Sequence, residues 1–405
     1  MKNLPHTPSL RFPQFSGNWE IKKLGEVTNK INSGKTPLGG EAVYSEEGIL
    51  FIRSQNINND KLELENKTFI PEEVNAGMKN SIVKPNDILL NITGASLGRS
   101  CVVPNDFQIG NVNQHVCIIR FNSNYNPRFV QPIFSSEKGQ NLFRTLQTGS
   151  GREGLNFENI KQIEISFPTL PEQEKIAGFL TVVDEKLQAL KKKKALLEEY
   201  KKGIMQRIFS GQLRFKDANG QPYPDWEVRK LGEVASFFSG GTPLTTIRDY
   251  FNGEIPFIRS GEINSDYTEQ FISESGLKNS SAKMVKKGDL LYALYGATSG
   301  EVGISKINGA INQAILCIRS IQNIIFLMNY LRYNKEIILK TFLQGGQGNL
   351  SADIIKSLEI SFPSLPEQEK IAEFLGALDA KIAALQSQLD KTMEWKKGLL
   401  QGMFC

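Results

Sequence analysis

Three patterns in this sequence look catalytic, and each lacks a part that the chemistry needs. Residues 149–154 have the G-x-G-x-x-G spacing of a dinucleotide-binding loop, but no strand–helix–strand unit encloses them. Residues 94–100 are one residue short of a phosphate-binding loop, and Arg99 stands where that loop requires lysine. Only two histidines, His6 and His115, are present and they lie far apart, which favours neither a catalytic triad nor a histidine-based metal site. We therefore expect no catalytic residues, no metal site and no cofactor.

Composition limits the function further. The four cysteines are scattered without C-x-x-C spacing, which indicates free thiols in a reducing compartment. The sequence has no apolar run of membrane-spanning length and no signal-peptide pattern at its N-terminus, so we expect a cytoplasmic protein without a membrane partner. The formal net charge is +5, which permits a nucleic-acid partner without requiring one.

Polar side chains that can contact a ligand recur in two glycine-containing loops. Residues 33–37 (Ser-Gly-Lys-Thr-Pro) return at 239–243 as Ser-Gly-Gly-Thr-Pro. The dipeptide Asn-Gln occurs at 113–114 and again at 312–313. Glycine and proline mark loops, and loops on a shared scaffold commonly carry function. Because Asn-Gln is present in both copies, it favours a framework role as much as a binding role.

These loops belong to an internal repeat that covers the chain. Leu-Pro-Glu-Gln-Glu-Lys-Ile-Ala at 170–177 reappears at 365–372, and the segment that begins at Trp19 reappears at Trp226. The offset between the copies shrinks along the chain, so the framework matches while the loops differ in length. A repeat of this length indicates a duplicated domain followed by a helix.

Each copy has the pattern of an α+β domain. Short apolar segments predict strands, and longer mixed segments predict helices. We expect strands at 51–54, 87–90 and 116–120 in the first copy and at 257–260, 289–292 and 315–319 in the second, with helices at about 127–146 and 324–343. Short strands, irregular loops and one or two helices predict an α+β fold with many surface loops.

Each L-P-E-Q motif opens a long helical pattern. Thr169 and Ser364 each precede a glutamate by three residues, which is the spacing of a capping box. Apolar residues then recur at every seventh position, so we expect two helices of about 35 residues, roughly 50 Å long, that pair as a coiled coil. The predicted seam is Ile176, Val183, Leu190, Leu197 and Ile204 in the first helix and Ile371, Leu378, Leu385, Thr392 and Leu399 in the second, with a companion stripe of Leu180, Leu187 and Ile208 against Leu375, Ile382 and Leu389.

An antiparallel pair is the natural geometry, because the first helix ends at the second domain and the second helix would then return to the first. The alternative is that each helix packs only on its own domain. The basic run at 191–194, with Lys201 and Lys202, is a solvated face, a phosphate contact or a docking surface.

This organisation resembles the specificity (S) subunit of Type I restriction–modification enzymes. The resemblance rests on the duplicated L-P-E-Q-E-K-I-A helices, the Trp-x-x-x-x-Leu-Gly-Glu-Val domain starts and the linker Phe-Ser-Gly-Gln-Leu-Arg-Phe at 209–215. It covers essentially the whole chain. It implies an α+β protein with two similar target recognition domains joined by two long helices in an antiparallel coiled coil, pseudo-two-fold symmetric.

The resemblance also implies the function and the partners. Each recognition domain would read one half of an asymmetric bipartite site on double-stranded DNA, and the helices would set the gap and dock two modification subunits. Those subunits would carry S-adenosylmethionine and methylate adenine at N6, and restriction subunits with ATP-driven translocation would complete the nuclease. The chain itself would be non-catalytic. We expect target recognition domain 1 at 1–170, a central spacer helix at 171–210, the linker with domain 2 at 211–365, and a distal spacer helix at 366–405.

DNA readout requires side chains that pair with base edges, such as arginine with guanine and asparagine or glutamine with adenine. For every candidate the alternative is a solvated loop residue or an internal hydrogen bond, and most protein–DNA contacts go to the backbone. In the first domain we nominate Lys35, Thr36, Arg53, Gln55, Asn56, Ser96, Arg99, Gln114 and Arg152. In the second we nominate Thr242, Arg259, Ser260, Tyr292, Tyr295, Thr298, Gln313, Gln347 and Asn349.

Two other functions are compatible with the sequence. A coiled-coil scaffold would not show the steeply salt-dependent binding of duplex DNA that phosphate neutralisation causes. An enzyme with an unrecognised site would bind S-adenosylmethionine as the isolated chain.

Overall fold

The computed structural model describes residues 7–147, 154–342 and 349–404 of the 405-residue chain. Its contacts divide the chain into two compact units. Unit 1 comprises residues 1–191 and 388–405, and unit 2 comprises residues 192–387. Each unit therefore holds one α+β domain, the start of one long helix and the end of the other.

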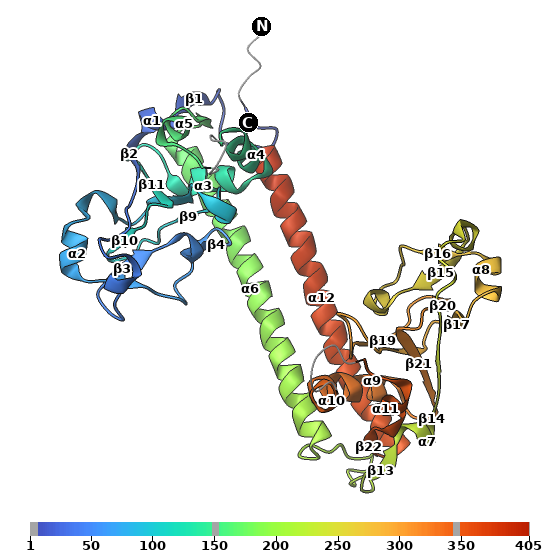
Figure 1. The fold of residues 1–405 in the computed structure, drawn as a ribbon. Helices are drawn as coiled ribbons and strands as arrows, with labels where there is room; N and C mark the ends of the chain where they lie inside the picture. Colours follow the sequence, from blue (N-terminus) through green and yellow to red (C-terminus); the bar gives the residue numbers. More distant parts are fainter. Residues whose placement is uncertain (1–6, 148–153, 343–348, 405) are drawn as a thin grey trace. The chain divides into compact units, whose positions relative to one another are not determined.

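Unit 1 contains two four-stranded sheets (Figure 1). One is antiparallel, with the order β2-β11-β8-β9, and the other has the order β6-β3-β10-β7 with β10 parallel to β3. The strands of unit 1 are β1 (Glu20–Lys23), β2 (Thr28–Ser33), β3 (Ile49–Ile52), β4 (Ile57–Asn58), β5 (Lys61–Leu62), β6 (Phe69–Ile70), β7 (Ile82–Val83), β8 (Ile88–Asn91), β9 (Ser100–Val102), β10 (Gly110–Val112), β11 (Val116–Phe121) and β12 (Glu164–Phe167).

Most helices of unit 1 pack on the antiparallel sheet, whereas α2 (Glu72–Ala76) packs on the second sheet. The helices of this unit are α1 (Leu24–Val27), α2, α3 (Pro127–Ser135), α4 (Glu137–Thr145), α5 (Phe157–Lys161) and the start of α6 (Leu170–Phe209). The single helix predicted at 127–146 is thus two helices. Ser136 interrupts it in an extended conformation, and its Oγ accepts a hydrogen bond from the Gly139 N–H, which caps α4.

Unit 2 repeats the two four-stranded sheets of unit 1. Its sheets have the orders β14-β21-β18-β19 and β16-β15-β20-β17, and β15 is again parallel to β20. The strands are β13 (Glu227–Lys230), β14 (Ala235–Ser239), β15 (Ile255–Ile258), β16 (Phe271–Ile272), β17 (Lys283–Val285), β18 (Leu290–Ala293), β19 (Val302–Ile304), β20 (Gly309–Ile311), β21 (Ile315–Ser320) and β22 (Glu359–Phe362). The helices are α7 (Leu231–Val234), α8 (Glu274–Lys278), α9 (Ile324–Tyr333), α10 (Lys335–Phe342), α11 (Ala352–Ser357) and the start of α12 (Leu365–Met403). The α+β prediction is confirmed.

The first and last strands of each domain pair with each other. β1 pairs antiparallel with β12, and β13 pairs antiparallel with β22. The short helix that follows is fixed in the same way in both units, because Leu24 N–H donates to Ile163 O and Leu231 N–H donates to Leu358 O, each at 2.9 Å. The repeated Trp-x-x-x-x-Leu-Gly-Glu-Val start therefore anchors the strand that leads into each long helix.

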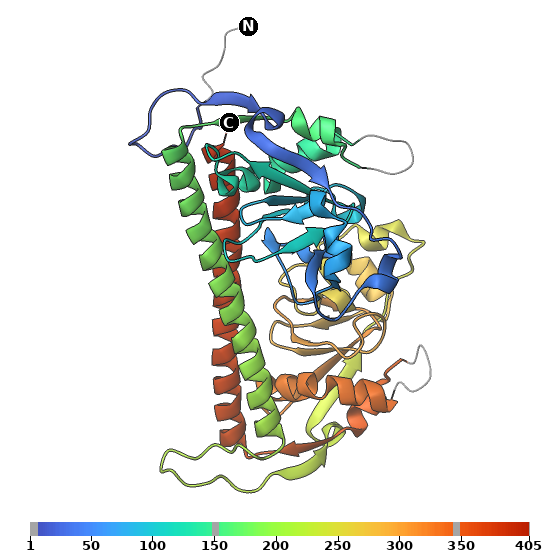
Figure 2. The ribbon, with the colours of Figure 1, turned by 90° about the vertical axis from the view of Figure 1, so that its left-hand side faces the viewer.

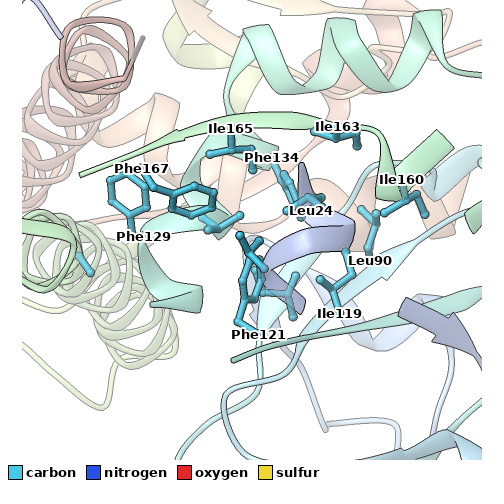
Figure 3. Close-up of a cluster of buried hydrophobic side chains, with 14 of the residues drawn as sticks. Leu24, Leu90, Ile119, Phe121, Phe129, Phe134, Ile160, Ile163, Ile165 and Phe167 are labelled. Carbon is cyan, nitrogen blue, oxygen red and sulfur yellow. The ribbon is translucent and has the colours of Figure 1, made fainter. Parts of the chain in front are cut away.

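The main core of unit 1 lies between the antiparallel sheet and the helices (Figure 3). Leu24 and Ile119 have no exposed surface, and Phe129 packs edge-on against Trp19 with ring centroids 5.6 Å apart. Full burial of a large apolar side chain contributes roughly 1.5–3 kcal/mol. The same cluster contains Leu180 of α6 and Leu399 of α12, so both long helices are part of this core.

The L-P-E-Q motifs join each long helix to its unit, although not as capping boxes. The carboxylate of Glu172 is bound at both oxygens by Arg11, at 2.7 and 2.8 Å. Glu367 is bound in the same way by Arg214, at 2.8 and 2.9 Å. The capping-box prediction is therefore wrong, because both glutamates are buried against arginine and the Ser364 hydroxyl has no hydrogen-bond partner within the described parts of the chain.

The glutamine of each motif is also structural. Gln173 accepts from Asn126 N–H and donates to Pro168 O, and Gln368 makes the equivalent bonds to Asn323 N–H and Pro363 O. The near-identity of the two motifs follows from these shared internal bonds.

The long helices pair antiparallel within each unit. In unit 1 the start of α6 (green) lies beside the end of α12 (red) (Figures 1 and 2), and Lys396 Nζ is 2.7 Å from Asp184 Oδ1. In unit 2 the end of α6 meets the start of α12, and Lys201 Nζ is 2.6 Å from Asp379 Oδ1. The coiled-coil prediction is confirmed, and the alternative of helices packed only on their own domains is wrong.

Burial along the predicted seam is uneven. Leu190, Leu197, Ile382 and Thr392 are half-buried, whereas the other predicted positions are buried. Within the basic run, Lys194 pairs with Glu198 one turn later. Lys201 is engaged by Asp379, so it holds the helix pair together in unit 2.

Candidate nucleic-acid interface

Two loops meet closely at the end of β10 in unit 1 and at the end of β20 in unit 2. Gly34 N–H donates to Asn113 O at 3.1 Å, and a Cβ on Gly34 would lie 1.6 Å from Val112 O. In unit 2 a Cβ on Gly240 would lie 1.8 Å from Ile311 O. Only glycine permits this approach of two main chains. The glycine of each Ser-Gly-x-Thr-Pro loop thus brings that loop against the Asn-Gln turn.

The close approach creates the same threonine–glutamine pair in both units. Thr36 Oγ1 donates to Gln114 Oε1 at 2.6 Å, and Thr242 Oγ1 donates to Gln313 Oε1 at 2.7 Å. All four residues are exposed. Four of the nominated residues are therefore brought together as two equivalent pairs, each with an amide oriented at the surface.

In unit 1 a second side chain orients the amide from its other side. Gln114 Nε2 lies 3.1 Å from His115 Nε2, and His115 Nδ1 lies 2.6 Å from Thr93 Oγ1. An amide nitrogen can only donate, so His115 Nε2 accepts and Nδ1 carries the proton. In unit 2, burial raises the pKa of Tyr295, and a side-chain hydrogen bond with Gln313 opposes that rise.

The sequence prediction missed His115 and Thr93. The available signal was the position of His115, which directly follows the repeated Asn-Gln dipeptide. Its importance becomes visible only once Thr93, from the loop after β8, is placed next to it.

The two residues of the Asn-Gln dipeptide have different roles. Asn113 Oδ1 accepts from His115 N–H, and Asn312 Oδ1 accepts from Ala314 N–H, each at 3.1 Å. These bonds close the same tight turn in both units. Asparagine is therefore the framework residue, and the neighbouring glutamine presents its amide at the surface.

The nominated arginines that directly follow β3 and β15 are engaged within their own units. Arg53 donates to Thr68 Oγ1 at 2.8 Å. Arg259 Nη2 pairs with Glu262 at 3.0 Å and with Glu269 at 2.7 Å. Burial opposes ionisation of Glu262, but hydrogen bonds from Arg259 and from the main chain outweigh it and hold the pKa of this carboxyl at about 2. Contact of either arginine with DNA stays a prediction.

Two nominated residues are buried, which corrects their assignment. Asn56 is 3% exposed, and its Nδ2 donates to the carbonyls of Glu63 and Asn66, so it organises its own loop. Tyr292 has no exposed surface, because β18 turns this side chain into the core of unit 2, and burial raises its pKa. Neither side chain is placed to contact a ligand at the surface.

The remaining nominated residues lie on loops of both units. Arg99 is exposed and donates to Asn58 Oδ1 at 2.6 Å. Lys35, Gln55 and Asn349 are exposed, and Ser96, Ser260 and Thr298 are half-buried. Arg152 and Gln347 lie outside the described residues.

In the described part of the chain, no three His, Cys, Asp or Glu side chains are grouped so that they could hold a metal ion. Cys117 and Cys317 are buried free thiols, and burial raises the pKa of each to about 12. Among the described helices, none is both long enough and apolar enough to cross a membrane.

Fold and site together define a duplicated binding scaffold: one α+β domain occurs twice, each time with an exposed threonine–glutamine pair and two helices that both units share. A family model described as "Type I restriction modification DNA specificity domain" matches the chain twice, at residues 16–199 and 223–394. This chain belongs to that family.

Known proteins agree with this assignment. The MjaIX Type I restriction enzyme specificity subunit of Methanocaldococcus jannaschii is 30% identical over 193 residues, which cover 44% of each chain. The EcoKI Type I specificity subunit of Escherichia coli is 21% identical over 414 residues, covering 95% of this chain and 87% of the relative. The crystal structure of a Type I S subunit from M. genitalium has the same fold, with a TM-score of 0.64 at 17% identity, covering 98% of this chain and 99% of that one.

Proposed function

We propose that this chain is the DNA-binding specificity subunit of a Type I restriction–modification complex, in which each recognition domain reads one half of an asymmetric bipartite site. The observation that carries the proposal is the exposed threonine–glutamine pair, which both units form from the same loops at 2.6 and 2.7 Å. Two similar reading surfaces suit two half-sites on one duplex. The surrounding loops differ between the copies, which favours two different half-sites.

The long helices are the proposed spacer and docking element. In this proposal residues 1–170 and 211–365 form the reading domains, and residues 171–210 and 366–405 form the spacer helices. Two modification subunits dock on the helices and methylate adenine at N6 with S-adenosylmethionine, and restriction subunits join to form the nuclease. The antiparallel pairing supports this division, because each helix is built into the cores of both units. The chain supplies specificity and no catalysis.

The test is methylome sequencing of cells that express this chain with its modification subunit. A single asymmetric, gapped motif is expected. A short continuous palindrome, or no new motif, would refute the proposal. Duplex binding by the assembled complex should also weaken steeply with salt, because the protein displaces counterions from the phosphates.

The spacer role has its own test. Insertion of one helical turn in register between residues 191 and 202 should lengthen the gap and leave both half-sites unchanged. A changed half-site would show that the helices take part in base readout.

A further inference from the structure

The glutamine amide on each unit has hydrogen-bonding capacity left after its internal bonds. We propose that Gln114 and Gln313 each read an adenine through its major-groove edge, at corresponding positions of the two half-sites. This inference rests on the proposed function and adds to it two specificity-determining residues and the base that they select. Gln114 and Gln313 differ from the other nominated surface residues because side-chain hydrogen bonds fix the orientation of their amide groups.

Internal bonds use only some of the hydrogen-bonding positions of the Gln114 amide. An amide oxygen accepts two hydrogen bonds, and an amide nitrogen donates two. Thr36 uses one acceptor position of Gln114, at 2.6 Å, and His115 uses one donor, at 3.1 Å. Among the described residues, one acceptor and one donor of this exposed side chain remain unused.

This remaining pair matches one base edge. In the major groove adenine presents the N6 amino donor next to the N7 acceptor, and glutamine binds both at once. Guanine presents two acceptors there, so it would leave the amide oxygen facing another oxygen. The orientation of the Gln114 amide, with Oε1 toward Thr36 and Nε2 toward His115, thus favours adenine.

Preorganisation strengthens the selectivity. A free surface glutamine would lose rotamer freedom on binding and could turn its amide over to suit another base. Thr36 and His115 oppose both changes, and Thr93 in turn holds the imidazole at 2.6 Å. Thr36 and His115 are positioning residues, because they act through the amide.

Unit 2 repeats the arrangement with one exchange. Thr242 takes the place of Thr36, whereas Ala314 stands where unit 1 has His115. Because the oxygen of Gln313 is oriented by the same hydroxyl, the same base is expected. The two half-sites should therefore share an adenine at the corresponding position and differ elsewhere.

The experiment is selection from a randomised duplex library by the chain assembled with its modification subunits. In the Gln114→Glu variant a carboxylate replaces the amide, so the donor for N7 is lost and cytosine N4 becomes the favoured partner. We expect the preference at one position of the first half-site to move from adenine to cytosine by about 5- to 150-fold, the range of one bidentate contact. Gln313→Glu should do the same in the second half-site only.

The matched control is Gln108→Glu. Gln108 is an exposed glutamine of the same unit, and its Nε2 donates to Asp106 O within its own loop. The Gln108→Glu substitution introduces the same negative charge and should leave every position of the selected site unchanged. The unaffected half-site of each variant reports that the protein is folded and assembled.

The positioning role is tested at Thr36. Thr36→Val keeps the shape and removes the hydroxyl, so discrimination for adenine should fall while binding to a non-specific duplex stays the same. Thr36→Ser should restore the discrimination. Replacing the selected adenine by 7-deazaadenine removes N7 and should weaken binding of the wild type by about 5-fold or more; a minor-groove contact would not respond.

Three results would overturn the inference while leaving the proposed function intact: an unchanged profile for Gln114→Glu, different bases selected by Gln114 and Gln313, or full affinity for the 7-deazaadenine site. Failure of the wild-type complex to select any site would instead refute the proposed function.

Discussion

Arg214→Met tests how a long helix is joined to its unit. The side chain of Glu367 has no exposed surface and is bound at both oxygens by Arg214, whose own side chain is 28% exposed. Trp226 Nε1 also donates to this carboxylate, at 3.1 Å. Removal of the guanidinium would leave a buried carboxylate with one neutral donor.

The magnitude follows from this geometry. Breaking a buried ion pair by removing one partner costs about 3–5 kcal/mol. The partial exposure of Arg214 and the remaining bond from Trp226 place the loss in the free energy of unfolding near the lower limit, at about 3 kcal/mol. In the double variant Arg214→Met/Glu367→Gln the uncompensated charge is gone, so a large part of that loss should be recovered.

The assay is guanidinium unfolding followed by circular dichroism and tryptophan fluorescence. The control is Arg229→Met, because Arg229 forms an exposed pair with Glu233 at 4.0 Å and should cost less than about 1 kcal/mol. The reasoning fails if Arg214→Met costs no more than the control, or if the double variant is as unstable as the single one.

Three further changes test other parts of the structure. Gly240→Ala should destabilise unit 2 and abolish readout of one half-site in the selection assay, because its Cβ would meet a carbonyl oxygen at 1.8 Å, whereas Gly261→Ala has open space and should be neutral. Tyr292→Phe should keep or slightly raise stability in guanidinium unfolding and leave the selected site unchanged, because the buried hydroxyl has no hydrogen-bond partner among the residues that the structure describes. The pKa of Glu262 is about 2 in the folded protein, against an ordinary value of 4.5. The ionised carboxylate therefore contributes stability above pH 4.5, and this contribution is lost as the pH falls toward 2. Arg259→Met should flatten this part of the curve of stability against pH.

Each of these predictions has a contradicting result. A neutral Gly240→Ala would mean that the two loops can separate without consequence. A marked loss of DNA selectivity in Tyr292→Phe would mean that the hydroxyl reaches the surface in the complex. An unchanged acid limb in Arg259→Met would mean that other groups hold the Glu262 carboxylate ionised.

Much of the architecture could be predicted from the sequence because it is encoded by local and repeated patterns. The heptads that include Ile176 and Ile371 predicted two paired helices, and the duplicated motifs predicted two similar α+β units. Periodicity shows which face of a helix is apolar, and an internal repeat shows that the same domain occurs twice. The same patterns could not reveal that Glu172 binds Arg11, because a capping box considers only residues within one helical turn and Arg11 lies far away in the sequence.

Only the tertiary structure decided which polar loop residues remain available at the surface. Tyr292 and Gln313 looked equally suited to a binding loop in the sequence, yet one lies in the core and the other is exposed. The threonine–glutamine pairs join residues far apart in the chain, and they depend on a glycine that lets two main chains approach closely. The amino-acid sequence alone thus determined the duplicated scaffold, whereas the orientation of each amide required the fold, because long-range hydrogen bonds leave no periodic signal.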